Sequence, residues 1–203
     1  MKKVLKLSVL MILVVSMTLS LVACGTGVTE KAEASVNGMF QAFKALDFEK
    51  AQQFVNLNEL TFDKDEVSLD VEAKTFMKAL FGKLDYAIVS SEKVDNNTVN
   101  VVVKITALDM KPILADFMIA APQYAFSNAF ADPQPTEEET AQKMEELLVA
   151  AATKDGLTTV TNEVTVKVVN RDNSWKIAPD DAFTNALFGG LKEASDALNE
   201  SFE

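Results

Sequence analysis

The fold is decided by residues 98–108, which read TVNVVVKITAL and follow a similar run at 84–94 after the polar turn Asp95-Asn96-Asn97. Both runs are rich in β-branched residues, which favour strands, and Asp and Asn tolerate the backbone angles of tight turns. Alternate residues of the second run are apolar, so they share one face of a strand: Val99, Val101, Val103, Ile105 and Ala107. The stretch therefore predicts a β-hairpin with one face in a hydrophobic core.

A second hairpin is predicted nearer the C-terminus. Residues 157–169 supply its first strand, in which alternate valines form the buried side. The turn is Arg171-Asp172-Asn173-Ser174, and residues 175–177 begin the return strand. The two hairpins together predict an antiparallel sheet.

Helices are predicted on the N-terminal side of this sheet. Apolar residues recur at the spacing of one helix face over residues 30–46, 48–55 and 71–83. The connector at 56–70 shows no clear period. These segments predict helices that bury one face each against the sheet.

Residues 109–156 predict a helical insertion between the two hairpins. Asp109 is well placed to cap the first helix, which we expect Pro122 to interrupt. Thr136 and Glu139 fit a capping box that opens the second helix. The whole pattern predicts an α+β fold, with N-terminal helices packed on two antiparallel hairpins and a helical insertion between the hairpins.

The first 24 residues have the features of a secretory signal. Lys2, Lys3 and Lys6 precede an uncharged apolar run at 7–23, which is a little shorter than the roughly 20 residues of a membrane-spanning helix. The run ends in Leu-Val-Ala-Cys, which resembles the bacterial lipobox, a motif whose cysteine is acylated and becomes the new N-terminus. An ordinary cleaved signal followed by an incidental cysteine is the alternative.

The lipobox resemblance implies both a cellular location and a domain organisation. Cys24 is the only cysteine, so the exported part can form no internal disulfide. We expect a lipoprotein signal peptide at 1–23, a lipidated tether at 24–34 and a single α+β domain at 35–203. A diacylglyceryl group on Cys24 would make membrane lipid the first partner and hold the domain at the extracytoplasmic face of the cell membrane, because two acyl chains anchor durably.

Charge excludes one class of partner. The chain has 19 basic and 30 acidic residues, and removal of the three signal-peptide lysines leaves 16 against 30, a net charge of −14. A domain this acidic is not expected to bind nucleic acid by neutralising phosphates. We also expect anionic lipid headgroups to repel it.

Composition also argues against catalysis. The chain has no histidine, its cysteine is assigned to lipid, and its seven glycines form no phosphate-binding loop. A pair of carboxylates of the glycosidase type remains open. The run Glu137-Glu138-Glu139 is better explained by its position at the start of a helix than by a cation site. We therefore expect no enzyme activity, no catalytic residues, no metal and no cofactor.

Two segments resemble a known family. Residues 39–51, MFQAFKALDFEKA, are similar to the helix pair that opens nuclear transport factor 2-like domains, and NSWKI at 173–177 is similar to their final strand. With the lipobox and Gly189-Gly190, their order resembles uncharacterised lipoproteins of Gram-positive bacteria. The resemblance covers residues 33–192 and implies a cone-like domain with a curved sheet and often a pocket between helices and sheet. It implies no particular chemistry.

Our first functional hypothesis is that this domain binds a small apolar or amphipathic ligand, because such pockets are mainly apolar with a few polar groups. Most phenylalanines of any domain are core residues, whereas tyrosine and tryptophan bring a polar group that needs a partner. The candidate ligand-binding residues are Tyr86, Trp175, Phe40, Phe43 and Phe117.

The second hypothesis is a protein-interaction module of a cell-envelope complex. Residues 112–131 carry one charge, Asp116, and would expose an apolar helical face at 113–129. A buried or half-buried core helix is the simpler explanation of the same segment, and a lid over a pocket is a further alternative.

Overall fold

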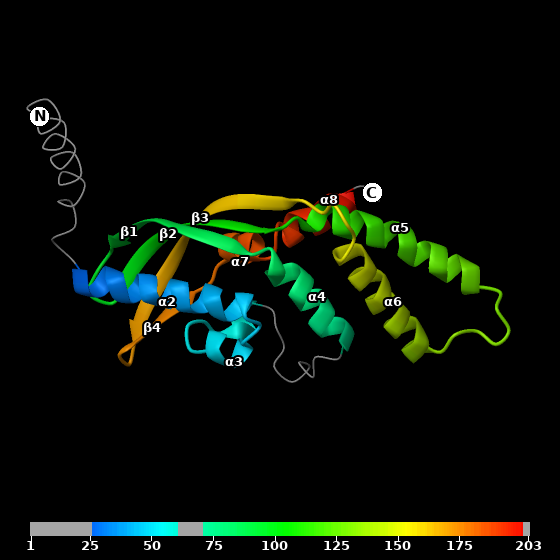
Figure 1. Ribbon diagram of the computed structural model, residues 1–203, viewed down its shortest axis with the longest axis horizontal. Coiled ribbons are helices and arrows are strands. Elements are labelled where there is room, and N and C mark those ends of the chain that lie inside the picture. Colours follow the sequence, from blue (N-terminus) through cyan, green and yellow to red (C-terminus); the bar gives the residue numbers. More distant parts are fainter. Residues whose placement is uncertain (1–25, 61–70, 201–203) are drawn as a thin grey trace, which may run out of the picture.

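The computed structural model describes residues 26–60 and 71–200, and it has the expected α+β architecture (Figure 1). Cys24 and the signal peptide lie outside the described residues, as do residues 61–70 of the predicted connector. The elements are α2 (Thr26–Lys44), α3 (Phe48–Ala51), the 3-10 helix η2 (Leu57–Leu60), α4 (Val71–Gly82), β1 (Asp85–Lys93), β2 (Thr98–Leu108), α5 (Met110–Asn128), α6 (Glu137–Ala152), β3 (Thr159–Arg171), β4 (Ser174–Ala178), α7 (Asp181–Leu187) and α8 (Leu191–Glu200).

The four strands form one antiparallel sheet in the order β1-β2-β3-β4. β2 pairs with β3 along its whole length, from Thr98 opposite Val169 to Leu108 opposite Thr159. Both predicted hairpins are confirmed, and in the second turn Asp172 and Asn173 have the positive φ angles that such turns require. The central pair β2–β3 therefore joins the two hairpins into one open sheet.

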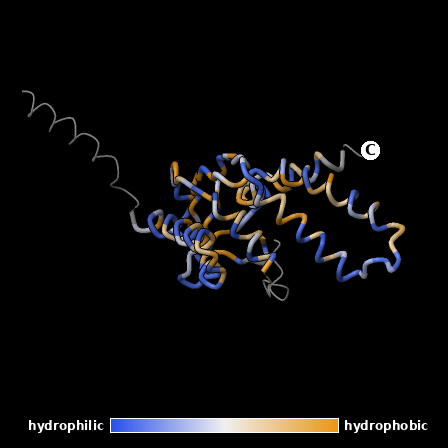
Figure 2. Tube along the Cα trace, turned by 45° about the vertical axis from the view of Figure 1, so that its right-hand side comes forward, coloured by the Kyte–Doolittle hydropathy of each residue, from blue (hydrophilic) through white to orange (hydrophobic). Residues whose placement is uncertain are grey.

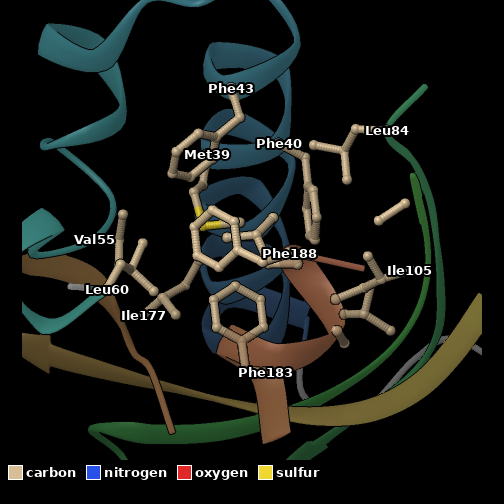
Figure 3. Close-up of a cluster of buried hydrophobic side chains, with 14 of the residues drawn as sticks. Met39, Phe40, Phe43, Val55, Leu60, Leu84, Ile105, Ile177, Phe183 and Phe188 are labelled. Carbon is tan, nitrogen blue, oxygen red and sulfur yellow. The ribbon is translucent and has the colours of Figure 1, made fainter. Parts of the chain in front are cut away.

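One face of the sheet is covered by α2 and α7, and the core lies between them (Figure 3). The alternate residues of β2 from Val99 to Ala107 are fully buried, as the sequence predicted. Lys104, Glu163 and Lys167 are exposed on the opposite face of the central strands. The sheet is therefore buried on one side and solvated on the other, which explains its clean alternation.

Helix α2 begins at Thr26, before the expected start at residue 30. Ala32 and Val36 are fully buried on the same stripe as Met39 and Phe40, so packing on the sheet supports the earlier turns. The folded domain consequently extends into the segment that was expected to be a tether.

Helix α5 runs without a break from Met110 to Asn128 and contains Pro122, although the sequence predicted an interruption there. Proline removes one helical hydrogen bond. Helix α5 packs on α6 along the side away from Pro122, and this contact offsets the loss of the hydrogen bond. The capping box of α6 is confirmed, because Thr136 Oγ1 accepts from the Glu139 amide at 3.2 Å and Glu139 Oε2 accepts from the Thr136 amide at 2.8 Å.

Gly189 supplies the first test of this packing. Its φ is +59°, and a Cβ at this position would collide with the Leu108 carbonyl oxygen. We expect Gly189→Ala to lower the free energy of unfolding by more than about 2 kcal/mol, because strain and a backbone clash add together. Gly82→Ala is the control, since nothing lies within 4 Å of a Cβ there. Urea unfolding that gives equal stability for both variants would contradict this account.

Candidate functional site

The structure brings two of the five candidate ligand-binding residues into direct contact. Phe40 on α2 stacks on Tyr86 of β1, with ring centroids 4.3 Å apart and planes 10° from parallel. The Tyr86 hydroxyl donates a hydrogen bond of 2.9 Å to Asn37 Oδ1, so its polar group is satisfied. Phe40 is 0% exposed. This pair is therefore part of the packed contact between α2 and β1.

The other three candidates lie apart. Phe43 is 0% exposed and packs on Phe81 at a centroid distance of 4.9 Å. Trp175 is on β4, at the other edge of the sheet from Tyr86, and its carbonyl oxygen accepts from Ser35 Oγ at 2.8 Å. Phe117 is half-buried on α5. A ligand-binding role for the five residues stays a prediction, and the structure does not gather them around one cavity.

Two hollows occur elsewhere on the described surface. One of about 630 Å³ lies beside the β3–β4 hairpin, and Gln52, Asn56, Glu59, Arg171 and Lys176 are among the residues that line it. Its lining also includes apolar side chains such as Val55 and Ile177. None of the five candidate residues lines it.

The second hollow is smaller, about 210 Å³, and almost entirely apolar. It lies between α4, the start of α5 and the start of α8. Its lining consists of Leu60, Phe76, Met77, Leu80, Met110, Phe188 and Leu191. Pockets for drug-sized ligands usually measure about 300–1,000 Å³, so only a small molecule or one acyl segment fits here.

The largest departure from a closed core is a projecting pair of helices. Helices α5 and α6 run antiparallel away from the sheet, and we call this pair with its connector the helical arm (Figure 1). At its base Met110 and Ile113 on α5 and Ala151 and Ala152 on α6 are buried. From residue 114 to residue 150, all described, no residue is buried. Besides the contacts of α6 with α4 and of α5 with α8, the contact between its own two helices covers the apolar side chains of the arm.

One side of α5 presents an uncharged apolar stripe to solvent. It consists of Ala115, Ile119, Pro122, Phe126 and, just beyond the helix end, Phe130, and we call it the apolar seam. Ile119 is 60% exposed, Phe126 78% and Phe130 97%. Orange and pale segments mark the apolar residues along this part of the arm in Figure 2. A helix that is apolar on both sides is normally covered on both sides.

Apart from Lys111, which lies one turn before Ala115 at the base of the arm, the charges of the arm lie away from the seam. Asp116, the one charge predicted for residues 112–131, pairs with Lys154 at 2.8 Å. On α6, Glu137, Glu138, Glu145 and Glu146 are exposed. The backbone hydrogen bond from Thr136 lowers the pKa of Glu139, so this carboxylate stays ionised at the tip. The arm thus has one apolar and one acidic exposed side.

A metal site and a membrane span have requirements that the described residues do not meet. They contain no group of three or more histidine, cysteine, aspartate or glutamate side chains arranged for a metal ion. No described helix has the length and apolar character needed to cross a membrane. The candidate interaction face at 113–129 lies on α5, and the structure shows which side of that helix is exposed.

Comparisons with known proteins yield one structural similarity. No protein-family model matches the sequence, and no curated protein matches it. The structure is similar to the crystal structure of "a putative lipoprotein (ycdA)" from Bacillus subtilis, with 13% identity and a TM-score of 0.37 over 83% of this chain and 45% of that chain. This chain therefore spans less than half of that protein's length. A similarity at this level carries no argument about function, and the nuclear transport factor 2-like resemblance stays a prediction.

Proposed function

We propose that this chain is a lipid-anchored, non-enzymatic lipoprotein of the extracytoplasmic face of a bacterial membrane, and that its helical arm is a protein-interaction surface. The observation that carries the second part is the apolar seam. It is exposed, it contains no charge, and it lies on a helix whose opposite side is already packed. Contiguous exposed apolar surface of this kind marks interaction sites in soluble domains.

The proposed anchor rests on the N-terminal sequence. A basic start, an apolar run and the single cysteine at the cleavage position support acylation of Cys24. Only Gly25 separates that cysteine from the first residue of α2. The folded domain would therefore stand close to the bilayer. The arm lies at the far end of the molecule from the start of α2, where it can meet a partner (Figure 1).

Energetics favour a covered seam. Burial of a Phe or Ile side chain contributes about 1.5–3 kcal/mol relative to exposure. Ile119, Phe126 and Phe130 all forgo most of this gain within one chain. A partner that covers the seam would recover it without breaking any contact of the core.

The anchor is tested by Cys24→Ser. We expect the variant to accumulate as an unprocessed precursor or to leave the membrane, because no diacylglyceryl group can be attached. Detergent partitioning of cell envelopes measures the change. Ser20→Ala, in the same signal segment, is the control that should leave processing intact. If a mature Cys24→Ser protein stayed in the membrane fraction as the wild type does, the proposed lipid anchor would be contradicted.

The interaction surface is tested by Ile119→Glu and Phe126→Glu in the full-length lipoprotein. Both positions are exposed, so we expect the free energy of unfolding to change by less than about 0.5 kcal/mol. We expect the substitutions to shift the protein from an assembly to a single chain, as measured by gel filtration of gently solubilised envelopes. Val94→Glu, at a position 56% exposed far from the arm, should change nothing. A wild-type protein that elutes as a single chain would refute an arm-mediated assembly.

A second candidate function is the binding of a small apolar ligand in the hollow of about 210 Å³. The observation that favours it is the apolar lining, in which Phe76 and Met77 of α4 are both half-buried and Leu191 of α8 is 39% exposed. The four aromatic candidates that pack in or against the core, Phe40, Phe43, Tyr86 and Trp175, would then support the fold while the ligand binds elsewhere.

Native mass spectrometry of the protein released gently from its own envelope tests this candidate. We expect extra mass that disappears on denaturation. Met77→Trp should remove that mass because it fills the hollow, whereas Lys78→Trp, the exposed neighbour, should keep it. A wild-type protein without extra mass would contradict ligand binding and leave the arm proposal intact.

A further inference from the structure

We propose that the partner of the apolar seam is a second copy of this chain, with the two α5 helices packed antiparallel about a two-fold axis between Ile119 and Pro122. This inference rests on the proposed function, because it takes the arm to be an interaction surface. It adds the identity of the partner and the register of the contact.

The spacing of the seam is that of a helix–helix contact. Ala115, Ile119, Pro122 and Phe126 follow one another at steps of four, three and four residues. Alternation of three and four is the repeat by which helices pack knobs into holes along a coiled-coil seam. A single exposed stripe with this repeat fits one further helix.

The seam is complementary to itself when it is reversed. Residues equidistant from the midpoint between Ile119 and Pro122 then face each other, so the Ala115 methyl meets the Phe126 ring of the other copy. The same symmetry places the exposed Lys111 ammonium group at the Phe130 ring of the other copy. A small side chain opposite a large one fills space, and a cation over an aromatic ring is attractive. Each of these contacts occurs twice, as an isologous interface requires.

Charge distribution favours this partner over a lipid surface. Both copies are acidic, yet the seam itself carries no charge, and α6 with its exposed glutamates packs on the side of α5 away from the seam. Two copies can therefore meet without bringing their acidic faces together. The arm tip carries Asp132 and Glu137, which anionic headgroups would repel.

The size of the contact sets its strength. A large aromatic side chain buries about 150–250 Å², so the seam offers on the order of 400 Å² per copy. Standard interfaces bury roughly 800 Å² per partner, so the contact is weak for free molecules. Anchoring in one membrane raises the effective concentration of the copies. The two-fold axis of an antiparallel pair is perpendicular to the two α5 helices. With this axis along the membrane normal, both arms lie parallel to the bilayer and both α2 helices begin at the same height above it, so both anchors reach one bilayer.

Register-specific cross-linking in native envelopes tests the proposal. Acylation occupies Cys24, so an introduced cysteine is the one reactive thiol of each copy. Two tagged copies, one with Ala115→Cys and one with Phe126→Cys, are co-expressed and treated with a short bis-maleimide. We expect a cross-linked pair that joins the two tags, several-fold more abundant than any product of either variant expressed alone. Val94→Cys expressed with either variant should give none.

A second pair keeps the test independent of the lost Phe126 ring. Lys111→Cys with Phe130→Cys should cross-link in the same way, because these positions face each other in the same register. Cross-linking of Ala115→Cys copies with one another would overturn the antiparallel arrangement. Cross-links from the seam to a different polypeptide would overturn the second-copy inference and leave the interaction function standing. Absence of every cross-link, with single-chain elution of the wild type, would overturn both.

Discussion

The structure depends on the packing of α2 across the apolar face of the sheet. The valines of β2 and the buried stripe of α2 exclude water from each other, and this contact is the centre of the core (Figure 3). Specific contacts extend it to both edges of the sheet, since Phe40 stacks on Tyr86 in β1 and Ser35 hydrogen-bonds the Trp175 carbonyl in β4. One helix thus fixes the positions of all four strands, and the early start of α2 at Thr26 follows from the length of that contact.

The packing of α2 on the sheet argues against a ligand site among the aromatic residues of the core. Phe40 and Phe43 already contact other aromatic rings, so a ligand among them would have to replace contacts that stabilise the core. The apolar hollow beside α4 and α8 requires no such exchange, because a ligand there would cover the partly exposed side chains of Phe76, Met77 and Leu191. Binding there would be compatible with an intact contact between α2 and the sheet. For this reason the aromatic residues of the sequence are better explained as contributors to the hydrophobic core than as parts of a ligand-binding site.

Local chemistry made much of the fold predictable. Alternation identified β2 and its buried face, Asp and Asn identified both turns, and the Thr136–Glu139 pair identified the start of α6. The predictions at the start of α2 and at Pro122 were wrong because tertiary contacts outweighed local signals. The helix predicted over residues 48–55 ends at Ala51, and Val55 instead forms a bridge with Ile177 of β4. The exposed side of α5 could not be predicted, because apolar residues occur on every side of that helix and its pattern does not distinguish the packed side from the free one. The sequence pointed to the segment that carries the exposed apolar side chains but not to the seam.

The arm itself is a consequence of the topology. β2 and β3 are antiparallel neighbours, so an insertion between them must leave and re-enter the sheet at the same end. A pair of antiparallel helices satisfies that constraint, but two helices can cover only the sides that face each other. The two outer sides of the arm differ in composition. The outer side of α6 is acidic, whereas the outer side of α5 carries Ile119 and Phe126. Solubility alone would favour polar residues on both. The asymmetry supports the proposal that one side of the arm is kept for solvent and the other for contact. In the proposed register the seam complements itself, so it would close with two copies instead of growing into a filament.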